Sequence, residues 1–184
     1  MAIRTILVCE AQVPFVRGGA ESLVRDLVRE LCDRGYQAAL VSVPFKWYPK
    51  DEILAHAAAW RLLDLSESNG TPIDLVIATK FPTYFVRHPN KVTWLMHQYR
   101  AAYELCGTEY SDFQHTDEDV GLRKRLIASR DIQHGRINLS SSPLLIRNKL
   151  SSGKIAHGQN IPRCADGAQI DLIRGRIDTW GQGD

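Results

Sequence analysis

Residues 4–34 constrain the fold more than any other stretch, because they have the pattern of a strand, a glycine loop and a helix. Residues 5–9 (TILVC) form a short apolar, β-branched run, which is typical of a strand buried on both faces of a parallel sheet. Residues 10–19 then form a predicted loop that ends in two glycines. The next apolar residues recur at the spacing of one helical face: Ala20, Leu23, Val24, Leu27, Val28 and Leu31.

The polar residues of this predicted helix define its other face and its end. Arg34 places a cation near the negative end of the helix dipole, and Gly35 is free to adopt a left-handed cap. The residues expected to face solvent are Glu21, Arg25, Asp26, Arg29 and Glu30.

The glycine loop gives the first functional indication. Gly18 and Gly19 at a helix start allow the backbone to approach a ligand closely, and the free N–H groups of the first turn favour an anion such as a phosphate. From spacing alone, a tight turn with no ligand explains the glycines equally well. The loop has neither the G-x-G-x-x-G dinucleotide fingerprint nor the Gly-Lys-Ser/Thr of a P-loop.

Composition excludes several classes of function. The chain has 184 residues, 44% of them hydrophobic, which is enough for one well-buried domain. Its net charge of +2 gives no argument for a nucleic-acid partner. We expect no signal peptide and no transmembrane segment, and therefore a cytoplasmic location. The four cysteines lack metal-ligand spacing, and Cys9 and Cys32 are expected to be buried free thiols.

Strand and helix patterns alternate along the chain. This alternation predicts an α/β, doubly wound, mostly parallel sheet of five or more strands, with right-handed crossovers. The further strands are expected at residues 37–43, 74–78, 91–96 and 136–139. The further helices are expected at residues 51–65, 117–133 and 142–150, with a short helix from Pro82 to residue 86.

Ligands bind such sheets at the carboxyl ends of the strands, so the loops there are the candidate site. These loops contain Gly18 and Gly19, residues 45–48, Lys80, residues 97–100 and residues 140–142. Together they indicate a polar crevice that tolerates phosphate. Trp47 and Tyr48 either stack on a sugar ring or cover the sheet edge. No serine lies in G-x-S-x-G, and no hydrolytic machinery is visible.

Four of these segments resemble one known family. Residues 13–21 (VPFVRGGAE), 44–49 (PFKWYP), 78–82 (ATKFP) and 94–100 (WLMHQYR) are together similar to the amino-terminal domain of family 4 glycosyltransferases. The resemblance covers about residues 3–153. It implies a GT-B fold with a Rossmann-like half. It also implies a bacterial enzyme that transfers a sugar, with retention and without a metal or other cofactor, from a nucleotide sugar to a glycan or lipid-linked acceptor.

The resemblance also assigns roles to residues. Gly18 and Gly19 match the loop that approaches the donor phosphates and the transferred sugar. His97 matches a histidine that faces the transferred sugar and is the candidate catalytic residue. Lys80 and Arg100 are the further candidate substrate ligands, although a cation at this edge is as often a solvated charge. The resemblance also admits peripheral association with a membrane.

The remaining residues depart from the family. Residues 1–153 are the predicted acceptor-side domain, whereas residues 154–184 have no periodicity for a second domain and suggest a truncated or frameshifted tail. The family's donor domain, with its basic residue and paired glutamates, is not in the sequence. We therefore expect an isolated chain that does not catalyse transfer. The alternative is a non-catalytic module that binds a sugar or nucleotide, or pairs with a separate donor half. An unrelated oxidoreductase is disfavoured by the absent dinucleotide fingerprint.

Overall fold

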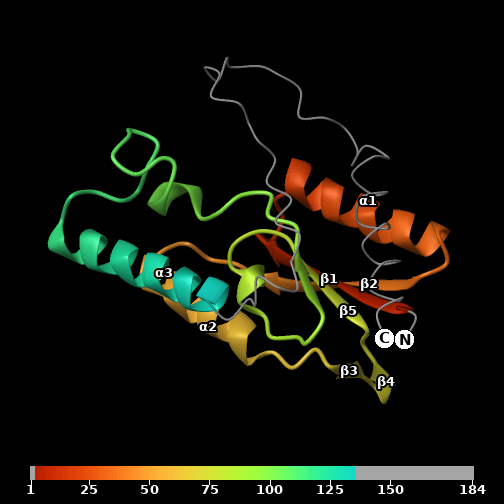
Figure 1. Cartoon of the computed structure of the whole chain (residues 1–184). Helices are drawn as coiled ribbons and strands as arrows, with labels where there is room; N and C mark the ends of the chain where they lie inside the picture. Colours follow the sequence, from red (N-terminus) through yellow and green to blue (C-terminus); the bar gives the residue numbers. More distant parts are fainter. Residues whose placement is uncertain (1–2, 136–184) are drawn as a thin grey trace.

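The computed structural model describes residues 3–135, and the side chains within them up to residue 129 (Figure 1). The strand expected at 136–139, the loop at 140–142, the helix from 142 and the tail from 154 lie outside the described residues. The prediction of a fifth strand therefore stays a prediction.

The described residues form a parallel sheet of four strands in the order β2-β1-β5-β6. Its strands are β1 (Thr5–Gln12), β2 (Gln37–Pro44), β5 (Leu75–Ala78) and β6 (Lys91–Thr93). The α/β class and the parallel pairing are confirmed. β1 lies between β2 and β5 and is buried along nearly its whole length.

β1 continues three residues beyond the predicted strand, because it pairs with β2 as far as Gln12 and Pro44. The prediction that the loop begins at Glu10 is therefore wrong. Glu10 is a strand residue that pairs with Ser42, and its side chain is buried. The last three residues of β1 are not an apolar run, because the polar Glu10 and Gln12 interrupt the pattern by which the strand was predicted.

Helices cover both faces of the sheet (Figure 1). The helices are α1 (Gly19–Asp33), α2 (Glu52–Leu62) and α3 (Asp117–Gly135), with short 3₁₀ turns η1 (Thr83–Phe85) and η2 (Arg100–Ala102). Pro82 precedes η1 instead of beginning it. A two-stranded hairpin, β3 (Glu67–Ser68) and β4 (Thr71–Pro72), precedes β5.

The alternation of side chains along β1 divides the core into two clusters. Ile6 and Val8 pack with the apolar face of α1, including Leu27. Leu7 and Cys9 face the opposite way and pack with α2, where Trp60 is fully buried. Leu122 and Leu126 of α3 belong to this second cluster. Burial of each such side chain contributes about 1.5–3 kcal/mol, so both helical layers are held by the central strand.

The end of α1 matches its prediction. Gly35 has a φ of +88°, and its N–H donates to the Cys32 carbonyl at 2.9 Å. The Tyr36 N–H donates to the Leu31 carbonyl at 3.1 Å, which completes a Schellman arrangement. The left-handed backbone at this point requires a glycine, and the chain can then turn directly into β2.

The cysteines differ from one another. Cys9 is buried as expected, and burial raises the pKa of its thiol to about 12. Cys32 is exposed, contrary to the prediction, because it lies on the solvent side of the last turn of α1. Within residues 3–135, no group of three potential ligands could hold a metal ion, and no helix has the length and apolar character needed to cross a membrane.

Candidate functional site

The candidate site lies at the carboxyl edge of the sheet, where the loops that follow the parallel strands emerge together. Gly18 follows β1, Lys80 follows β5 and His97 follows β6. Arg100 is at the start of η2. All strands of this sheet run the same way, so these loops leave the same edge, as the sequence predicted for residues up to 100.

Glu21 connects two of these loops. Its Oε2 accepts a hydrogen bond of 2.9 Å from the Gly18 N–H, and its Oε1 lies 2.7 Å from Lys80 Nζ. The side chains of Lys80 and Glu21 are only 12% and 8% exposed. The expectation that Glu21 faces solvent is therefore wrong. Glu21 is the third residue of α1, from where a carboxylate can reach back over the helix start.

The protonation of Glu21 reflects this contact. Burial alone would raise the pKa of the Glu21 carboxyl, but the hydrogen bond and charge of Lys80, together with backbone N–H groups of Glu21 and Gly18, hold this pKa below its ordinary value. The Glu21 carboxylate therefore already occupies part of the position at the start of α1 where the helix dipole favours an anion. Lys80 neutralises it, so this cation is not a solvated charge.

The two glycines of the loop have different surroundings. Gly18 has an ordinary φ of −116°, so no left-handed turn requires it. A Cβ on Gly18 would lie 3.0 Å from Glu21 Oε2, and this crowding gives a local reason for the missing side chain. Gly19 is exposed, and among the described residues nothing accepts a hydrogen bond from the N–H groups of Gly19 or Ala20. These two donors remain open to a ligand.

A second buried carboxylate lies at the end of β1. Glu10 is 1% exposed, and its Oε2 accepts a hydrogen bond of 3.0 Å from the Ser42 hydroxyl. The same hydroxyl lies 3.1 Å from Gln12 Oε1. Glu10 Oε1 is buried and has no hydrogen-bond partner within residues 3–135. These three residues, Glu10, Gln12 and Ser42, are called the edge cluster below.

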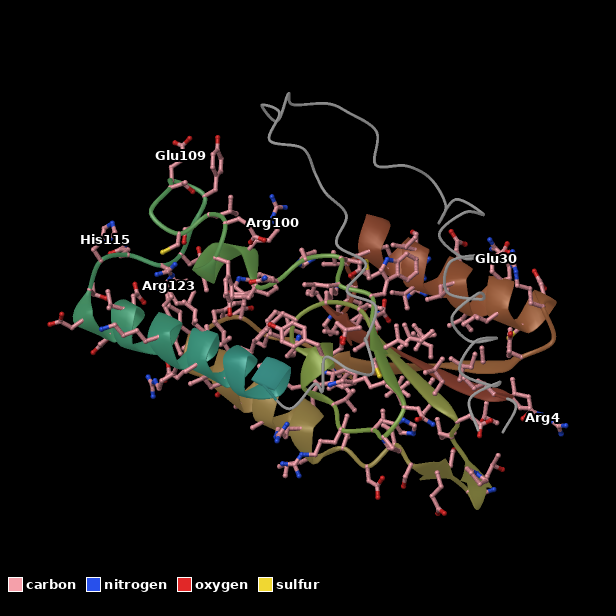
Figure 2. All side chains as sticks on the ribbon, viewed as in Figure 1. Arg4, Glu30, Arg100, Glu109, His115 and Arg123 are labelled. Atoms are coloured by element: carbon pink, nitrogen blue, oxygen red, sulfur yellow. The ribbon has the colours of Figure 1, made fainter. Side chains whose placement is uncertain are left out.

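His97 is half-buried, and its ring has a defined orientation. Nδ1 lies 2.7 Å from the Gln98 carbonyl oxygen, which can only accept, so Nδ1 carries the proton. In the neutral ring, Nε2 then presents its lone pair, and no residue among 3–135 forms a hydrogen bond with it. Arg100 is exposed, and Figure 2 shows its side chain directed away from the sheet. The orientation of the His97 ring is thus fixed by a hydrogen bond, whereas the exposed Arg100 side chain is not held in this way.

Large apolar side chains are exposed on two loops at this edge. Phe15 and Val16 lie in the glycine loop, and Tyr48 is 61% exposed in the loop after β2. Trp47 packs against the edge of Tyr48, and Lys46 Nζ lies 5.4 Å above the Tyr48 ring. Of the two interpretations for Trp47 and Tyr48, this exposure disfavours the one in which they cover the sheet edge.

Another hollow, of about 690 Å³, lies between the amino ends of α2 and α3. Lys50 Nζ binds both oxygens of Asp119 there, at 2.8 and 2.9 Å, and the Gln114 N–H donates to Asp119 Oδ2. Lys50 and Asp119 therefore neutralise each other in the wall of this hollow. The residues that line this hollow are distant in sequence from the glycine loop, and no sequence motif predicted a site there.

Sequence reasoning missed Glu10 and Glu21. The signal for Glu21 was present, because a glutamate three residues after a helix cap has capping-box spacing. For Glu10 no such signal exists, since its burial depends on the length of the pairing between β1 and β2. Comparisons of the chain with protein-family models, with curated proteins and with solved structures found no match.

Proposed function

We propose that this chain is the amino-terminal, acceptor-side half of a retaining glycosyltransferase that uses a nucleotide-sugar donor and no metal. The observation that carries the proposal is the open start of α1. Gly19 has no side chain to obstruct a ligand, and the N–H groups of Gly19 and Ala20 are unoccupied in the described part of the chain. A phosphate at this point would gain two hydrogen bonds and the favourable end of the helix dipole.

The other candidate residues take different roles in this proposal. His97 presents Nε2 as an acceptor for a sugar hydroxyl or for a proton. Lys80 acts through Glu21, because its ammonium group is already bound to that carboxylate. Arg100 is exposed, so it would contact a ligand as a solvated cation, which is the weakest of these contributions.

Transfer requires a second wall to the cleft. Retaining transfer needs the donor, the acceptor and cations on the leaving diphosphate to be held in one closed, preorganised site. The described residues supply one wall. We therefore propose that a donor-binding domain, encoded with this chain or separately, completes the enzyme, and that this chain alone does not turn over. The exposed Phe15, Val16, Trp47 and Tyr48 are consistent with a surface that another body covers.

One observation favours a second candidate function, a non-catalytic module that binds a sugar or nucleotide. Glu21 partly fills the anion position and neutralises Lys80, so a diphosphate gains less here than at an unoccupied helix start. Such a module would bind the sugar or nucleoside part of its ligand more strongly than the phosphates.

The test is a calorimetric titration of the chain with UDP-glucose, UDP-N-acetylglucosamine and GDP-mannose, with nucleotide release followed in parallel. We expect weak binding, no release, and loss of binding in Gly19→Val, whose Cβ and methyl groups obstruct the open N–H groups. His97→Ala should weaken binding as well. His115→Ala is the matched control, because His115 is exposed at the start of α3 in Figure 2, away from the glycine loop.

Two results would contradict the proposal. Equal binding by the native chain and Gly19→Val would remove the glycine loop from the site. Turnover by the isolated chain at a rate typical of enzymes, about 1 s⁻¹ or more, would show that no second domain is needed. Binding of nucleosides as strong as that of nucleotide sugars would favour the non-catalytic module.

A further inference from the structure

The edge cluster contains a buried charge that the fold does not satisfy. Glu10 is at the carboxyl end of the central strand and is 1% exposed, yet no described residue forms a hydrogen bond with its Oε1. The neighbouring buried carboxylate, Glu21, has both a cation and a backbone donor. Leaving a buried acceptor unpaired destabilises a fold, and more so when the group is charged.

The cluster has too few hydrogen-bond donors. Ser42 has one hydroxyl hydrogen but lies within hydrogen-bond distance of both Glu10 Oε2 and Gln12 Oε1. If the Gln12 amide is turned so that its nitrogen donates to Ser42, the Ser42 hydrogen goes to Glu10 Oε2, and Oε1 is still unpaired. Every arrangement of these three side chains therefore leaves at least one carboxylate oxygen that needs a donor.

No described cation fills this need. The ion pairs in residues 3–135 join Asp26, Glu30, Asp119 and Glu21 to their partners, and none of them includes Glu10. Lys80 already binds Glu21. A metal ion would require further ligands, and no group of three is present among the described residues.

We propose that the edge cluster is a binding subsite for the hydroxyl groups of a sugar, in which Glu10 accepts from the ligand and Gln12 and Ser42 complete the contact. A neutral hydroxyl supplies the missing donor without adding an anion beside a carboxylate, and Gln12 and Ser42 can each both donate and accept, as neighbouring sugar hydroxyls do. The identification of the ligand as a sugar rests on the proposed function, and the position of the subsite rests on Glu10.

The geometry gives the ligand a route. β2 is the edge strand of the described sheet, and Ser42 on it is exposed. The carboxylate of Glu10 thus lies one hydrogen bond below the surface, and rotation of the carboxyl group exchanges its two oxygens. A hydroxyl that displaces Ser42 from Oε2 would free Ser42 to donate to Oε1. Both oxygens of the Glu10 carboxylate would then have a donor.

The experiment follows the backbone amides of the ¹⁵N-labelled full chain during titration with D-glucose, D-galactose and N-acetyl-D-glucosamine. We expect the amide signals of residues 10–12 and 42–44 to shift saturably with at least one of these sugars. Trimethylamine N-oxide, which has no hydrogen-bond donor, should leave them unchanged. Glu10→Gln should weaken the binding about tenfold or more, because a hydrogen bond to a charged group is lost.

Stability measurements separate a binding role from a structural one. Glu10→Gln removes an unpaired buried charge, so its melting temperature should equal or exceed that of the native chain. Ser42→Ala is a second variant at an exposed position and should also weaken binding. Glu67→Gln is the matched control, because Glu67 is exposed on β3, outside the carboxyl edge.

The inference is overturned if no sugar shifts these amides, if Glu10→Gln binds as tightly as the native chain, or if Glu10→Gln clearly lowers the melting temperature. These outcomes are separable from the proposed function. Nucleotide-sugar binding that Gly19→Val abolishes and Glu10→Gln preserves would support the function and remove the subsite. Shifts of the amide signals around Glu10 with a simple sugar, without any binding of nucleotide sugars, would support the subsite and contradict the proposed function.

Discussion

The start of α1 and the carboxyl end of β1 each bury a glutamate, and the two surroundings differ in whether that carboxylate is satisfied. At α1, Glu21 binds a lysine and a backbone N–H. At the end of β1, Glu10 shares the single hydroxyl hydrogen of Ser42 with Gln12, and its other oxygen has no partner among the described residues. The comparison teaches that burial alone does not reveal the role of a carboxylate. Breaking a satisfied pair leaves a partner buried and unpaired, whereas an unsatisfied carboxylate calls for an explanation, which we propose is a ligand.

The largest expected effect is the loss of the satisfied contact. Glu21→Ala should lower the free energy of unfolding by about 3 kcal/mol, because it leaves the Lys80 ammonium buried without its partner and removes a helix cap. Urea denaturation measures this. The double variant Glu21→Leu with Lys80→Met should recover most of the loss. A loss below about 0.5 kcal/mol in Glu21→Ala would place this pair among ordinary surface contacts.

A smaller effect is expected from crowding the same carboxylate. Gly18→Ala places a Cβ 3.0 Å from Glu21 Oε2, so the carboxylate must shift, and we expect a loss of about 1 kcal/mol. Gly121 of α3 is the control, because a Cβ there meets nothing within 4 Å. Gly121→Ala should stabilise the chain by about 0.5–1 kcal/mol. Thermal denaturation of both variants should therefore give shifts of opposite sign, and shifts of the same sign would refute the steric argument.

The pH dependence of stability gives a further comparison. Because the pKa of Glu21 is lower in the folded chain than its ordinary value of 4.5, the unfolded chain binds more protons as the pH falls through this range. The contribution of Glu21 is therefore complete above pH 4.5 and is lost below it. The difference in unfolding free energy between the native chain and Glu21→Gln should narrow on acidification. The comparison of the two chains removes the contributions of the other carboxyl groups whose pKa is lowered, such as Asp74 and Asp119, because both chains contain them.

The smallest expected effect is at the unsatisfied carboxylate. Ser42→Ala removes the only hydrogen-bond donor to Glu10 among the described residues, but Ser42 is exposed and water can replace its hydroxyl. We expect the free energy of unfolding to change by less than about 0.5 kcal/mol. A loss comparable to that of Glu21→Ala, measured in the same urea series, would mean that the edge cluster is a structural network.

The fold could be predicted from local patterns in the sequence. Apolar runs such as residues 75–78 and the helical spacing of residues 20–31 indicate burial directly. The period at which apolar residues recur corresponds to one type of secondary structure. The left-handed cap at Gly35 followed from the same reading. The boundaries were less accurate, since the end of β1 is set by pairing with Pro44, which lies far along the chain.

The site could be predicted only in part. Parallel strands place Gly18, Lys80 and His97 at one edge whatever their side chains do, so their common location was predictable. Their contacts were not. Glu21 was assigned to the solvent side because helical spacing counts only how apolar a residue is, and a carboxylate at the first turn obeys capping geometry instead. Lys80 is consequently the buried ion-pair partner of Glu21 and is not open to bind a substrate.

The central position of β1 also has a consequence for how the protein is made. β1 is bordered by β2 on one side and by β5 on the other, and the hydrogen bond from Thr79 Oγ1 to the Cys9 carbonyl joins residues 70 positions apart. During translation, β1 leaves the ribosome well before β5 and meets β2 first. Its second edge then stays open until β5 emerges, which makes this interval the one in which the nascent chain is most exposed to aggregation and most dependent on chaperones.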